Sequence, residues 1–373
     1  MQEFSNADQK YMKRALELAK LGEGRTSPNP MVGAVVVKDG KIVGEGYHQE
    51  YGGPHAEVFA LEEAGTKAVG ADIYVSLEPC SHYGKTPPCA QKLIDTGIKR
   101  AVVAMVDPNP EVAGRGIDML RKAGIKVEIG LFKKEAQKLN EIFLKYIQSD
   151  YPFVYLKKAQ TLDGYIASKT GDSKWITNSA ARLEGHKLRH RVDAIIVGIG
   201  TVLADNPSLT ARLDNKEGVD PLRVILDPDL EIPLNAKLIN QNSTANTLIV
   251  TAENSDKADL EKRDELSKNK MVEILSLKSN NKYFDLREVL KSLRQRKISS
   301  LLVEGGAKLS HTFLKEDLVD KFYYFIAPKI YGGSDGTASF CGKGPELMSD
   351  AVNLKILEQK LLGDNILLIA ERK

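Results

Sequence analysis

The chain contains few cysteines and lacks long apolar runs. Its three cysteines, Cys80, Cys89 and Cys341, are too few among 373 residues for a disulfide framework. No stretch of 18 or more apolar residues occurs, so the sequence predicts no membrane-spanning helix. Residues 1–22 also lack the apolar centre of a signal peptide and have the pattern of an amphipathic helix. We therefore expect a cytoplasmic protein.

A large excess of charge of one sign is also missing. The chain has 53 Lys and Arg against 50 Asp and Glu, a net charge of +3, and the basic residues form no dominant block. Nucleic-acid surfaces normally need a concentrated basic stripe, so we expect no nucleic-acid partner and no membrane partner. A single hydrophobic core rarely extends over so many residues, so we expect two domains.

The first part of the chain alternates apolar strands with helical patterns, which predicts an α/β architecture. Met31–Lys38 and Lys41–Tyr47 flank Asp39-Gly40, a dipeptide that favours a tight hairpin turn. Helices and strands are then expected to alternate, starting with a helix, at His55–Ala64, Asp72–Leu77, Pro88–Thr96, Arg100–Val106, Ile117–Ala123 and Lys126–Gly130.

A domain boundary is expected where the charged helical stretch Lys133–Tyr151 meets Pro152, because proline blocks further helix. The predicted domains are residues 1–150 and 151–373. Strands of the second are expected at Phe153–Ala159, Ala194–Gly198, Arg223–Leu226, Thr247–Thr251 and Ser300–Val303, and helices near Ala180–Arg191, Leu286–Arg296 and Leu309–Leu314. The tail segments Lys321–Ala327 and Ile356–Ala370 are expected to form antiparallel edge strands, and Glu253–Asn281 to form surface helix and loop.

A metal motif occupies the first half. His55-Ala56-Glu57 opens a predicted helix, and Cys80 and Cys89 follow with eight residues between them. One imidazole and two thiolates leave a fourth zinc position open for water, whose pKa zinc lowers towards neutrality. Glu57 lies on the same helical turn as His55 and can shuttle protons without binding the metal. Zinc nucleobase deaminases share H-x-E…P-C-x-x-C, although two residues separate the cysteines in that pattern.

Two other interpretations of this motif stay open. A structural zinc site would need a fourth protein ligand, for which His48 or His82 is available. A zinc-stabilised binding protein without catalysis is the second alternative, although a structural site has no use for Glu57. The long cysteine spacing counts against a third, a tRNA or nucleotide deaminase fused to an unrelated module.

Polar turns occur beside the predicted strands. Asn29 precedes the first strand within Ser27-Pro28-Asn29-Pro30, and Asp107 and Asn109 follow Arg100–Val106. These residues are also common in simple turns. Because ligands of open α/β sheets bind at strand ends, their occurrence around a zinc motif favours substrate contacts.

Long motifs in both halves resemble the bifunctional RibD family of riboflavin biosynthesis. The run PNPMVGAVVVKDGKIVGEGYHQEYGGPHAE, with LEPCSHYGKTPPC and VDPNP, is similar to its deaminase half. LKKAQTLDGYIA, SKWIT, DAIIVGIGTVLADNPSLTAR, VILDP, VEGGAKL and IAPKIYGG are similar to its reductase half. The resemblance implies a cytidine-deaminase-like α/β/α domain followed by a dihydrofolate-reductase-like α/β domain. It also implies zinc and NADPH as cofactors and a homo-oligomer.

The resemblance further implies deamination of 2,5-diamino-6-ribosylamino-4(3H)-pyrimidinone 5′-phosphate, then reduction of the ribosyl chain of 5-amino-6-(5-phosphoribosylamino)uracil to ribityl. The implied zinc ligands are His55, Cys80 and Cys89, with Glu57 as the catalytic proton shuttle. Contacts to the deaminase substrate are implied at Asn29, His48, Lys85, Asp107 and Asn109. Lys85 in the loop between the cysteines would meet a phosphate, and the alternative is a solvated loop lysine.

For the reductase, the resemblance implies two sets of contacts. The sugar-phosphate substrate is expected to contact Lys157, Ser173, Arg189, Leu209, Arg212 and Glu304. NADPH is expected to contact Ala159, Trp175, Thr201, Asp205, Gly306, Ala307, Lys308, Leu309, Ser310, His311 and Thr312. The Gly305-Gly306 pair ends a strand where the next helix begins, which suits a cofactor phosphate because the first backbone N–H groups of a helix are free.

Overall fold

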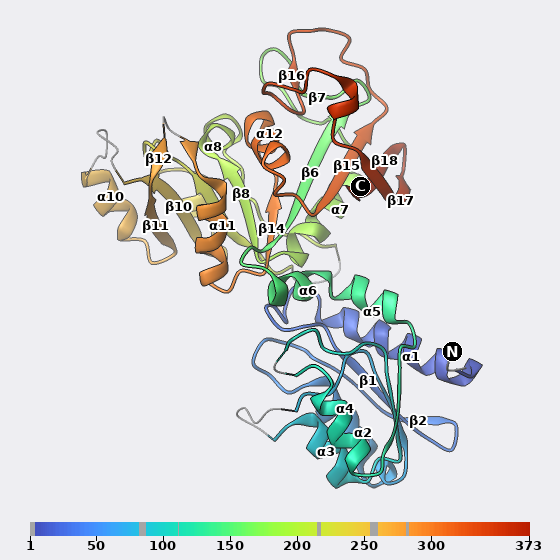
Figure 1. The fold of residues 1–373 in the computed structure, drawn as a ribbon. Helices are drawn as coiled ribbons and strands as arrows, with labels where there is room; N and C mark the ends of the chain where they lie inside the picture. Colours follow the sequence, from blue (N-terminus) through green and yellow to red (C-terminus); the bar gives the residue numbers. More distant parts are fainter. Residues whose placement is uncertain (1–3, 82–86, 111, 215–217, 254–259, 281–282) are drawn as a thin grey trace. The chain divides into compact units, whose positions relative to one another are not determined.

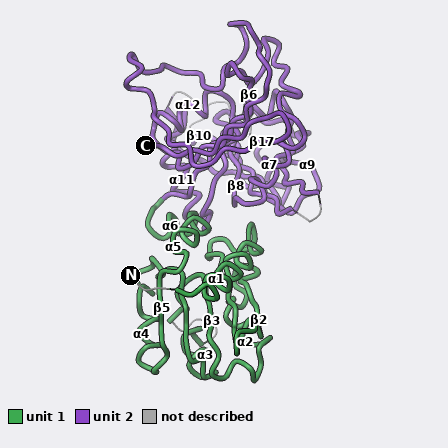
Figure 2. The backbone as a smooth tube through the Cα atoms, turned by 90° about the vertical axis from the view of Figure 1, so that its right-hand side faces the viewer, with its two compact units in different colours: residues 1–150 green, residues 151–373 purple. Residues whose placement is uncertain are grey.

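The chain forms two compact units, residues 1–150 and residues 151–373 (Figure 2). The computed structural model describes residues 4–81, 87–110, 112–214, 218–253, 260–280 and 283–373. Both units are mixed α/β folds, as predicted (Figure 1).

Unit 1 is built on one mixed sheet with the strand order β2-β1-β3-β4-β5. Its strands are β1 (Gly33–Lys38), β2 (Lys41–Tyr47), β3 (Asp72–Val75), β4 (Arg100–Val103) and β5 (Lys126–Ile129). The pairs β1–β2 and β1–β3 are antiparallel, whereas β3, β4 and β5 run parallel. The predicted hairpin is confirmed, and Asp39 and Gly40 at its tip both have positive φ, as a tight turn between twisted strands requires.

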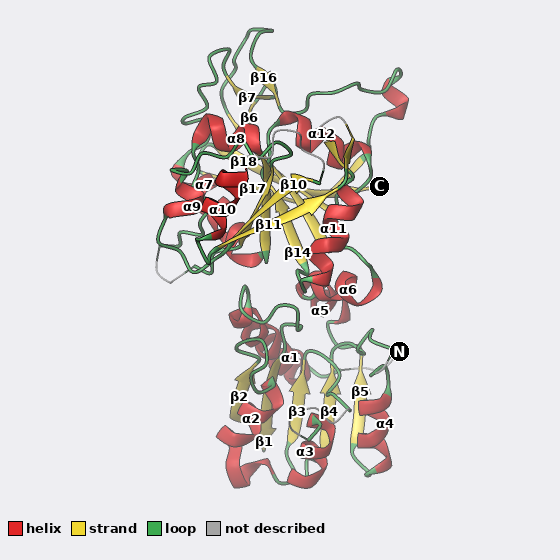
Figure 3. Ribbon diagram, turned by 90° about the vertical axis from the view of Figure 1, so that its left-hand side faces the viewer, coloured by secondary structure: helices red, strands yellow, loops and turns green. Residues whose placement is uncertain are grey.

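Helices cover both faces of this sheet and give three layers (Figure 3). They are α1 (Asn6–Ala19), η1 (Lys20–Gly22), α2 (Ala56–Ala64), η2 (Gly65–Ala68), α3 (Cys89–Thr96), α4 (Arg115–Lys122), α5 (Lys133–Leu139) and α6 (Glu141–Gln148). Because side chains alternate along a strand, Ala34 and Val36 pack with α2, α3 and α4, whereas Val35 and Val37 pack with α1, α5 and α6. The two apolar layers hold the site helices firmly against the sheet.

Glycines bring α2 unusually close to the sheet. A Cβ on Gly44 would lie 2.1 Å from the carbonyl oxygen of Ala60, and one on Gly46 would lie 2.3 Å from that of Ala56. The β2 backbone therefore touches the helix directly, with no side chain between them. This contact fixes the position of the first turn of α2, where Glu57 lies.

Unit 2 contains a larger sheet with the order β11-β10-β9-β8-β14-β6-β15-β18-β17. Its strands are β6 (Phe153–Thr161), β8 (Ala194–Gly198), β9 (Leu222–Leu226), β10 (Thr247–Ala252), β11 (Val272–Leu277), β14 (Ser300–Val303), β15 (Lys321–Ala327), β17 (Leu354–Leu362) and β18 (Asn365–Arg372). Short pairs form from β7 (Tyr165–Ala167) with β16 (Thr337–Ala338), and from β12 (Ser279–Asn280) with β13 (Tyr283–Phe284). Among the described residues, the antiparallel pairs of the large sheet both involve β18, which pairs with β15 on one side and with β17 on the other.

The helices of unit 2 connect these strands. They are α7 (Ser179–Arg191), α8 (Ile199–Asp205), α9 (Lys237–Asn240), α10 (Leu260–Ser267), α11 (Leu286–Gln295), α12 (Ala307–Lys315) and the turn η3 (Met348–Asp350). The core gathers apolar residues of the central strands and of α11 and α12, with Val154, Leu156, Leu293, Leu301 and Phe313 fully buried.

Two expectations for unit 2 were wrong in part. The strand Lys321–Ala327 is not an edge strand. It pairs parallel with β6 on one side and antiparallel with β18 on the other. Its burial on both sides explains the continuous apolar run Phe322–Ala327. The polar stretch Glu253–Asn281 contains, besides the expected helix, the edge strand β11, whose half-buried side chains give only a weak apolar signal.

Among the described residues, no helix combines the length and the apolar character that crossing a membrane requires.

Candidate functional sites

Three metal-binding side chains converge in unit 1. His55 directly precedes α2, Cys89 begins α3, and Cys80 lies in the loop after β3. The Nδ1 of His55 lies 3.6 Å from the Sγ of Cys80 and 3.3 Å from the Sγ of Cys89. All three ligand atoms lie within 4.8 Å of one another. One imidazole and two thiol groups at this separation fit the donor set of a tetrahedral zinc ion.

Contacts within this donor set make Cys80 the more acidic of its two thiols. Hydrogen bonding with Cys89 and with His55 lowers the pKa of the Cys80 thiol to about 4, against the effect of its burial. The same contact with Cys80 raises the pKa of His55 to about 9. The contact with Cys80, together with burial, raises the pKa of the Cys89 thiol. Because a metal binds thiolates and a neutral imidazole, a metal ion would displace the protons of Cys89 and His55 on binding.

Glu57 lies beside these ligands in the first turn of α2 and is only 3% exposed. Burial raises the pKa of Glu57 to about 7. Its Oε2 atom has no hydrogen-bond partner within the described part of the chain. A buried oxygen without a partner is costly, so this atom needs a water molecule or a substrate group. His55, Glu57 and Cys80 line a cavity of about 340 Å³ that has room for both.

His48 does not complete a four-ligand site, because both of its ring nitrogens bond elsewhere. Its Nδ1 lies 3.0 Å from the carbonyl oxygen of Pro54, and its Nε2 lies 3.2 Å from the side-chain nitrogen of Asn29. The arrangement fits a neutral ring that donates to Pro54 and accepts from Asn29, and burial lowers the pKa of His48 accordingly. His82 and Lys85 lie outside the described residues. Among the described residues no fourth protein ligand joins His55, Cys80 and Cys89, which leaves a position open as in a catalytic zinc site.

The predicted substrate residues of this unit share one cavity. Asn29, His48, Asp107 and Asn109 line the same space as Glu57, although they come from loops far apart in the sequence. The Oδ1 of Asp107 accepts a hydrogen bond of 2.8 Å from the backbone of Asn109, which shapes this turn. Asp107 and Asn109 therefore both form the turn and line the cavity.

Glu78 is a site residue to which the sequence analysis assigned no role. Its buried carboxylate accepts four backbone N–H groups, from Asp107 and Gly114 at Oε2 and from Gly116 and Ile117 at Oε1, at 3.0–3.2 Å. Glu78 thus ties the Asp107 loop and the start of α4 to the segment that carries Cys80. The one sequence feature that could have indicated this role is the position of Glu78 directly before Pro79 and the metal-binding Cys80.

Helix α6 also contributes to the cavity of unit 1, through Phe143, Tyr146 and Ile147. Asn140 fixes the start of this helix, because its side chain accepts from the Met31 backbone N–H at 2.8 Å and donates to the Met31 carbonyl at 3.0 Å. The sequence pattern gave only a charged helix here. Nothing in it indicated which face of the helix would meet the cavity.

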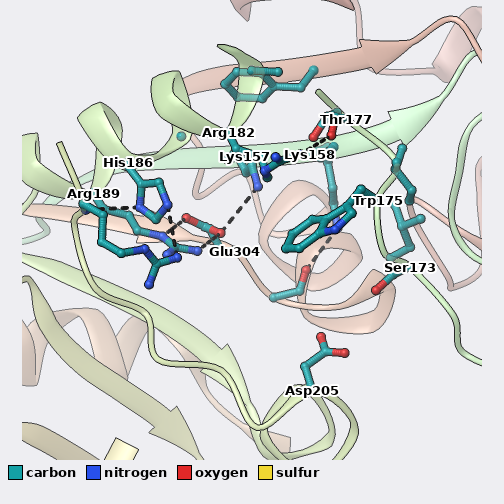
Figure 4. Close-up of a pocket in the computed structure, with 18 residues that line it drawn as sticks. Lys157, Lys158, Ser173, Trp175, Thr177, Arg182, His186, Arg189, Asp205 and Glu304 are labelled. Carbon is teal, nitrogen blue, oxygen red and sulfur yellow. Dashed lines mark hydrogen bonds and ion pairs between the residues drawn. The ribbon is translucent and has the colours of Figure 1, made fainter. Parts of the chain in front are cut away.

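In unit 2, a buried carboxylate organises a second cavity, of about 320 Å³ (Figure 4). Glu304 follows β14, and its two oxygens lie 2.8 and 2.9 Å from the Nε and Nη2 atoms of Arg189. Lys157 of β6 approaches the same carboxylate at 3.5 Å. Burial alone would raise the pKa of Glu304, but the charges of Arg189 and Lys157 hold it well below its usual range. The cavity therefore contains an ionised carboxylate clamped between two cations.

Arg212 is exposed and meets this cavity from the loop after α8. Its Nη1 donates to the Thr210 hydroxyl at 3.0 Å, and its Nη2 lies 3.2 Å from Nε2 of His186 on α7. His186 was not predicted, and neither was Arg182, whose guanidinium stacks 4.4 Å from the ring centre of Trp175. Both line the cavity.

The structure brings most, but not all, of the predicted reductase residues to this cavity. Its lining includes Lys157, Ala159, Ser173, Trp175, Arg189, Asp205, Arg212 and Glu304. Leu209 is buried with a positive φ outside the lining, and Thr201 and Gly306–Thr312 also lie outside it.

The residues outside the lining still form a surface that fits a cofactor phosphate. A Cβ on Gly306 would lie 3.8 Å from the hydroxyl of Thr201, so the starts of α8 and α12 are neighbours. Neither helix has a side-chain cap at its start, which leaves its first N–H groups free of a capping side chain. A Cβ on Gly198 or Gly200 would meet nothing within 4 Å, so the backbone there is open to a ligand.

Comparisons with known proteins match both units. The family described as "Cytidine and deoxycytidylate deaminase zinc-binding region" matches residues 5–105, and "RibD C-terminal domain" matches residues 152–368. The chain is 46% identical to the riboflavin biosynthesis protein RibD of Aquifex aeolicus, over 98% of both chains. It is 42% identical to that of Escherichia coli K12, over 97% of this chain and 98% of the other.

Solved structures agree along the whole length. Acinetobacter baumannii RibD superimposes with a TM-score of 0.87 at 41% identity, covering 98% of this chain and 99% of that one. A Thermotoga maritima protein titled as a diaminohydroxyphosphoribosylaminopyrimidine deaminase/5-amino-6-(5-phosphoribosylamino)uracil reductase gives a TM-score of 0.85 at 39% identity, with the same coverage.

Fold and sites define a class of bifunctional enzyme, a zinc-dependent deaminase joined to an NADPH-dependent reductase. The full-length relatives then give the family: the chain belongs to the RibD family of riboflavin biosynthesis proteins. The family and fold predicted from the sequence motifs are confirmed.

Proposed function

We propose that unit 1 deaminates 2,5-diamino-6-ribosylamino-4(3H)-pyrimidinone 5′-phosphate and that unit 2 then reduces the ribosyl chain of 5-amino-6-(5-phosphoribosylamino)uracil to ribityl. The name of the Thermotoga maritima relative contains both activities. The observation that carries the proposal is the buried Glu57 carboxylate, whose Oε2 has no hydrogen-bond partner in the described residues and which lines the cavity beside a three-ligand metal site. A binding protein would gain nothing from such a costly arrangement.

In unit 1, His55, Cys80 and Cys89 would hold zinc, which acts when bound as a Lewis acid towards water. Glu57 would take a proton from the attacking water and deliver it to the substrate, so that the amino group leaves as ammonia. Asn29 and Asn109, which line the cavity from two different loops, would offer their amide groups to the pyrimidine ring. Tyr146 of α6 would form an aromatic wall beside that ring.

In unit 2, NADPH would supply the hydride, and the start of α12 near Thr201 would receive its phosphate groups. Reduction also consumes a proton, for which the Lys157 ammonium, held by Glu304 at 3.5 Å, is a donor that lines the cavity. Arg189 is occupied by the Glu304 carboxylate. We therefore assign the substrate phosphate mainly to the exposed Arg212, with Arg189 keeping Glu304 ionised and in place.

The test is to supply the diaminopyrimidine to the full chain and follow ammonia release, then NADPH oxidation. Glu57→Gln should greatly slow ammonia release but keep NADPH oxidation with the deaminated intermediate. Arg212→Ala should keep ammonia release but raise the KM of the deaminated intermediate in NADPH oxidation. Loss of both activities in either variant would contradict the division of labour between the units. As a further test, residues 1–150 alone should release ammonia, because this segment retains α6 and its cavity residues.

We also propose that the chain forms a homo-oligomer in the cytoplasm, without a nucleic-acid partner. Edge strand β17 leaves Ile356 and Leu361 59% and 73% exposed, and an unpaired apolar edge favours association with a second copy. The free cysteines, two of them zinc ligands, suit a reducing compartment. Light scattering should give a mass above 41.1 kDa, and Ile356→Lys should lower it.

A further inference from the structure

The exposed Arg212 lies in a loop whose backbone is fixed from two sides. The Ala211 N–H donates to the Asp220 carboxylate at 2.8 Å. Gly218 packs against the same residue, since a Cβ on it would lie 2.3 Å from the Ala211 carbonyl oxygen. The backbone beneath Arg212 is therefore well defined. A long exposed side chain on it nevertheless has many rotamers, most of which point away from the cavity.

His186 of α7 removes much of this freedom. Its Nδ1 lies 3.1 Å from the Thr210 carbonyl oxygen, and its Nε2 lies 3.2 Å from the Nη2 of Arg212. Only a ring with its proton on Nδ1 satisfies both contacts, because it donates to the carbonyl and accepts from the guanidinium. The backbone N–H of Arg212 lies 3.3 Å from Nδ1. In this tautomer it faces another donor, so this one contact is given up for the other two.

We infer that His186 is a positioning residue, which holds the Arg212 guanidinium towards the reductase cavity so that it can bind the substrate phosphate. This inference rests on the proposed function of unit 2. His186 and the Thr210 hydroxyl use two of the five guanidinium N–H groups, which leaves three for a phosphate. Because the orientation exists before the ligand arrives, less side-chain entropy is lost on binding.

The surroundings of His186 keep its ring neutral, as an acceptor must be. Arg189 on the same helix, Arg212 on the facing loop and Glu304 at the end of β14 are the charged groups that face it. Burial, followed by the charges of Arg189 and Arg212, lowers the pKa of His186 to about 4. A protonated ring would present N–H to the Arg212 N–H and would push the guanidinium away.

Reductase kinetics with the deaminated intermediate and saturating NADPH test this role in the full chain. His186→Leu should raise the KM of the intermediate about tenfold, the effect of one hydrogen bond to a charged group, with kcat within about twofold. His186→Gln should restore most of the affinity, because its amide oxygen can accept from Arg212. Lys187→Leu, at the next and exposed position of α7, is the matched control and should leave KM unchanged.

A double variant separates positioning from general damage. If His186 acts through Arg212, His186→Leu should add nothing to the KM of Arg212→Ala. Multiplied effects in the double variant, or a wild-type KM in His186→Leu, would overturn the inference. A wild-type KM in Arg212→Ala would overturn it together with the phosphate assignment in the proposed function.

Nuclear magnetic resonance of histidine-labelled full chain tests the geometry without any substrate. At pH 7 the ¹⁵N shifts of His186, assigned by comparison with His186→Gln, should show a protonated Nδ1 and an unprotonated Nε2. The Nε2 shift should change in Arg212→Ala. A ring protonated at Nε2 would overturn the inference, even if the reductase is active. If the ring has the expected tautomer but the chain has no reductase activity, only the proposed function is contradicted.

Discussion

Replacing Glu78 by glutamine is expected to destabilise unit 1 and loosen its substrate loop, although the two side chains have the same shape. The carboxylate accepts four backbone N–H groups, two on each oxygen. An amide keeps only one acceptor oxygen. Its NH₂ group would face either Asp107 and Gly114 or Gly116 and Ile117, so two buried donors would meet another donor.

The size of the effect follows from these contacts. A hydrogen bond to a charged group contributes about 1.5–3 kcal/mol, so losing two gives a gross cost of about 3–6 kcal/mol. In a unit of this length, 1 kcal/mol shifts Tm by about 2–4 °C. Since the loop can relax outwards, we expect the lower part of the range, a fall of about 10 °C. The displaced Asp107 loop should also raise the deaminase KM.

Calorimetry of the full chain can check this, because zinc addition should shift the transition of unit 1 selectively. Glu62→Gln is the control, since Glu62 is exposed and its contact with Lys92 at 3.3 Å is worth little. A Glu78→Gln variant whose Tm lies within about 2 °C of the wild type, with an unchanged KM, would refute the role given to these four bonds.

Three more outcomes are expected. Cys80→Ser and Cys89→Ser should lose zinc by elemental analysis whereas Cys341→Ser keeps it, and equal loss in Cys341→Ser would contradict the ligand set. Glu57→Gln should keep zinc but release ammonia on the order of 10²–10⁴-fold more slowly, and a loss below about tenfold would move the proton relay elsewhere. Burial and the neighbouring Lys157 charge lower the pKa of Lys158 to about 7, so between pH 7 and 10 the unfolded chain binds more protons and stability rises with pH. Urea unfolding of unit 2 should show a gain of about 2 kcal/mol from pH 7 to 9 that Lys158→Met removes, and equal slopes would contradict the buried amine.

The sequence predicted those features that depend on local patterns. The hairpin at Asp39-Gly40 follows from turn chemistry, and the donor set His55, Cys80 and Cys89 follows from residue types that few other functions need. Strand positions in both sheets were close for the same reason. Such features are encoded within a few residues, or within a motif whose chemistry is specific.

Features that depend on long-range packing were missed. His186 contacts Arg212 across 26 residues, and Asn140 contacts Met31 across 109. Neither pair has a local pattern that marks it. The antiparallel pairing of β15 with β18 agrees with the prediction, but its parallel pairing with β6 was missed, because an apolar strand has the same pattern beside a parallel or an antiparallel neighbour. Only the crossover through α12 decides it.

Each unit has a buried glutamate in its cavity, Glu57 in unit 1 and Glu304 in unit 2, and their surroundings suit them to different roles. Glu304 has a cation on each side, so its charge is fixed and its two oxygens are engaged by Arg189 and Lys157. Such a group orients its neighbours and has little freedom to exchange a proton. One oxygen of Glu57 has no partner in the part of the chain that the structure describes, and burial raises the pKa of this carboxyl group to near neutral pH. A group that transfers protons must be stable both with and without its proton. Accordingly, no cation among the described residues is paired with Glu57 of the deaminase unit, whereas Glu304 of the reductase unit is held as a carboxylate between two cations.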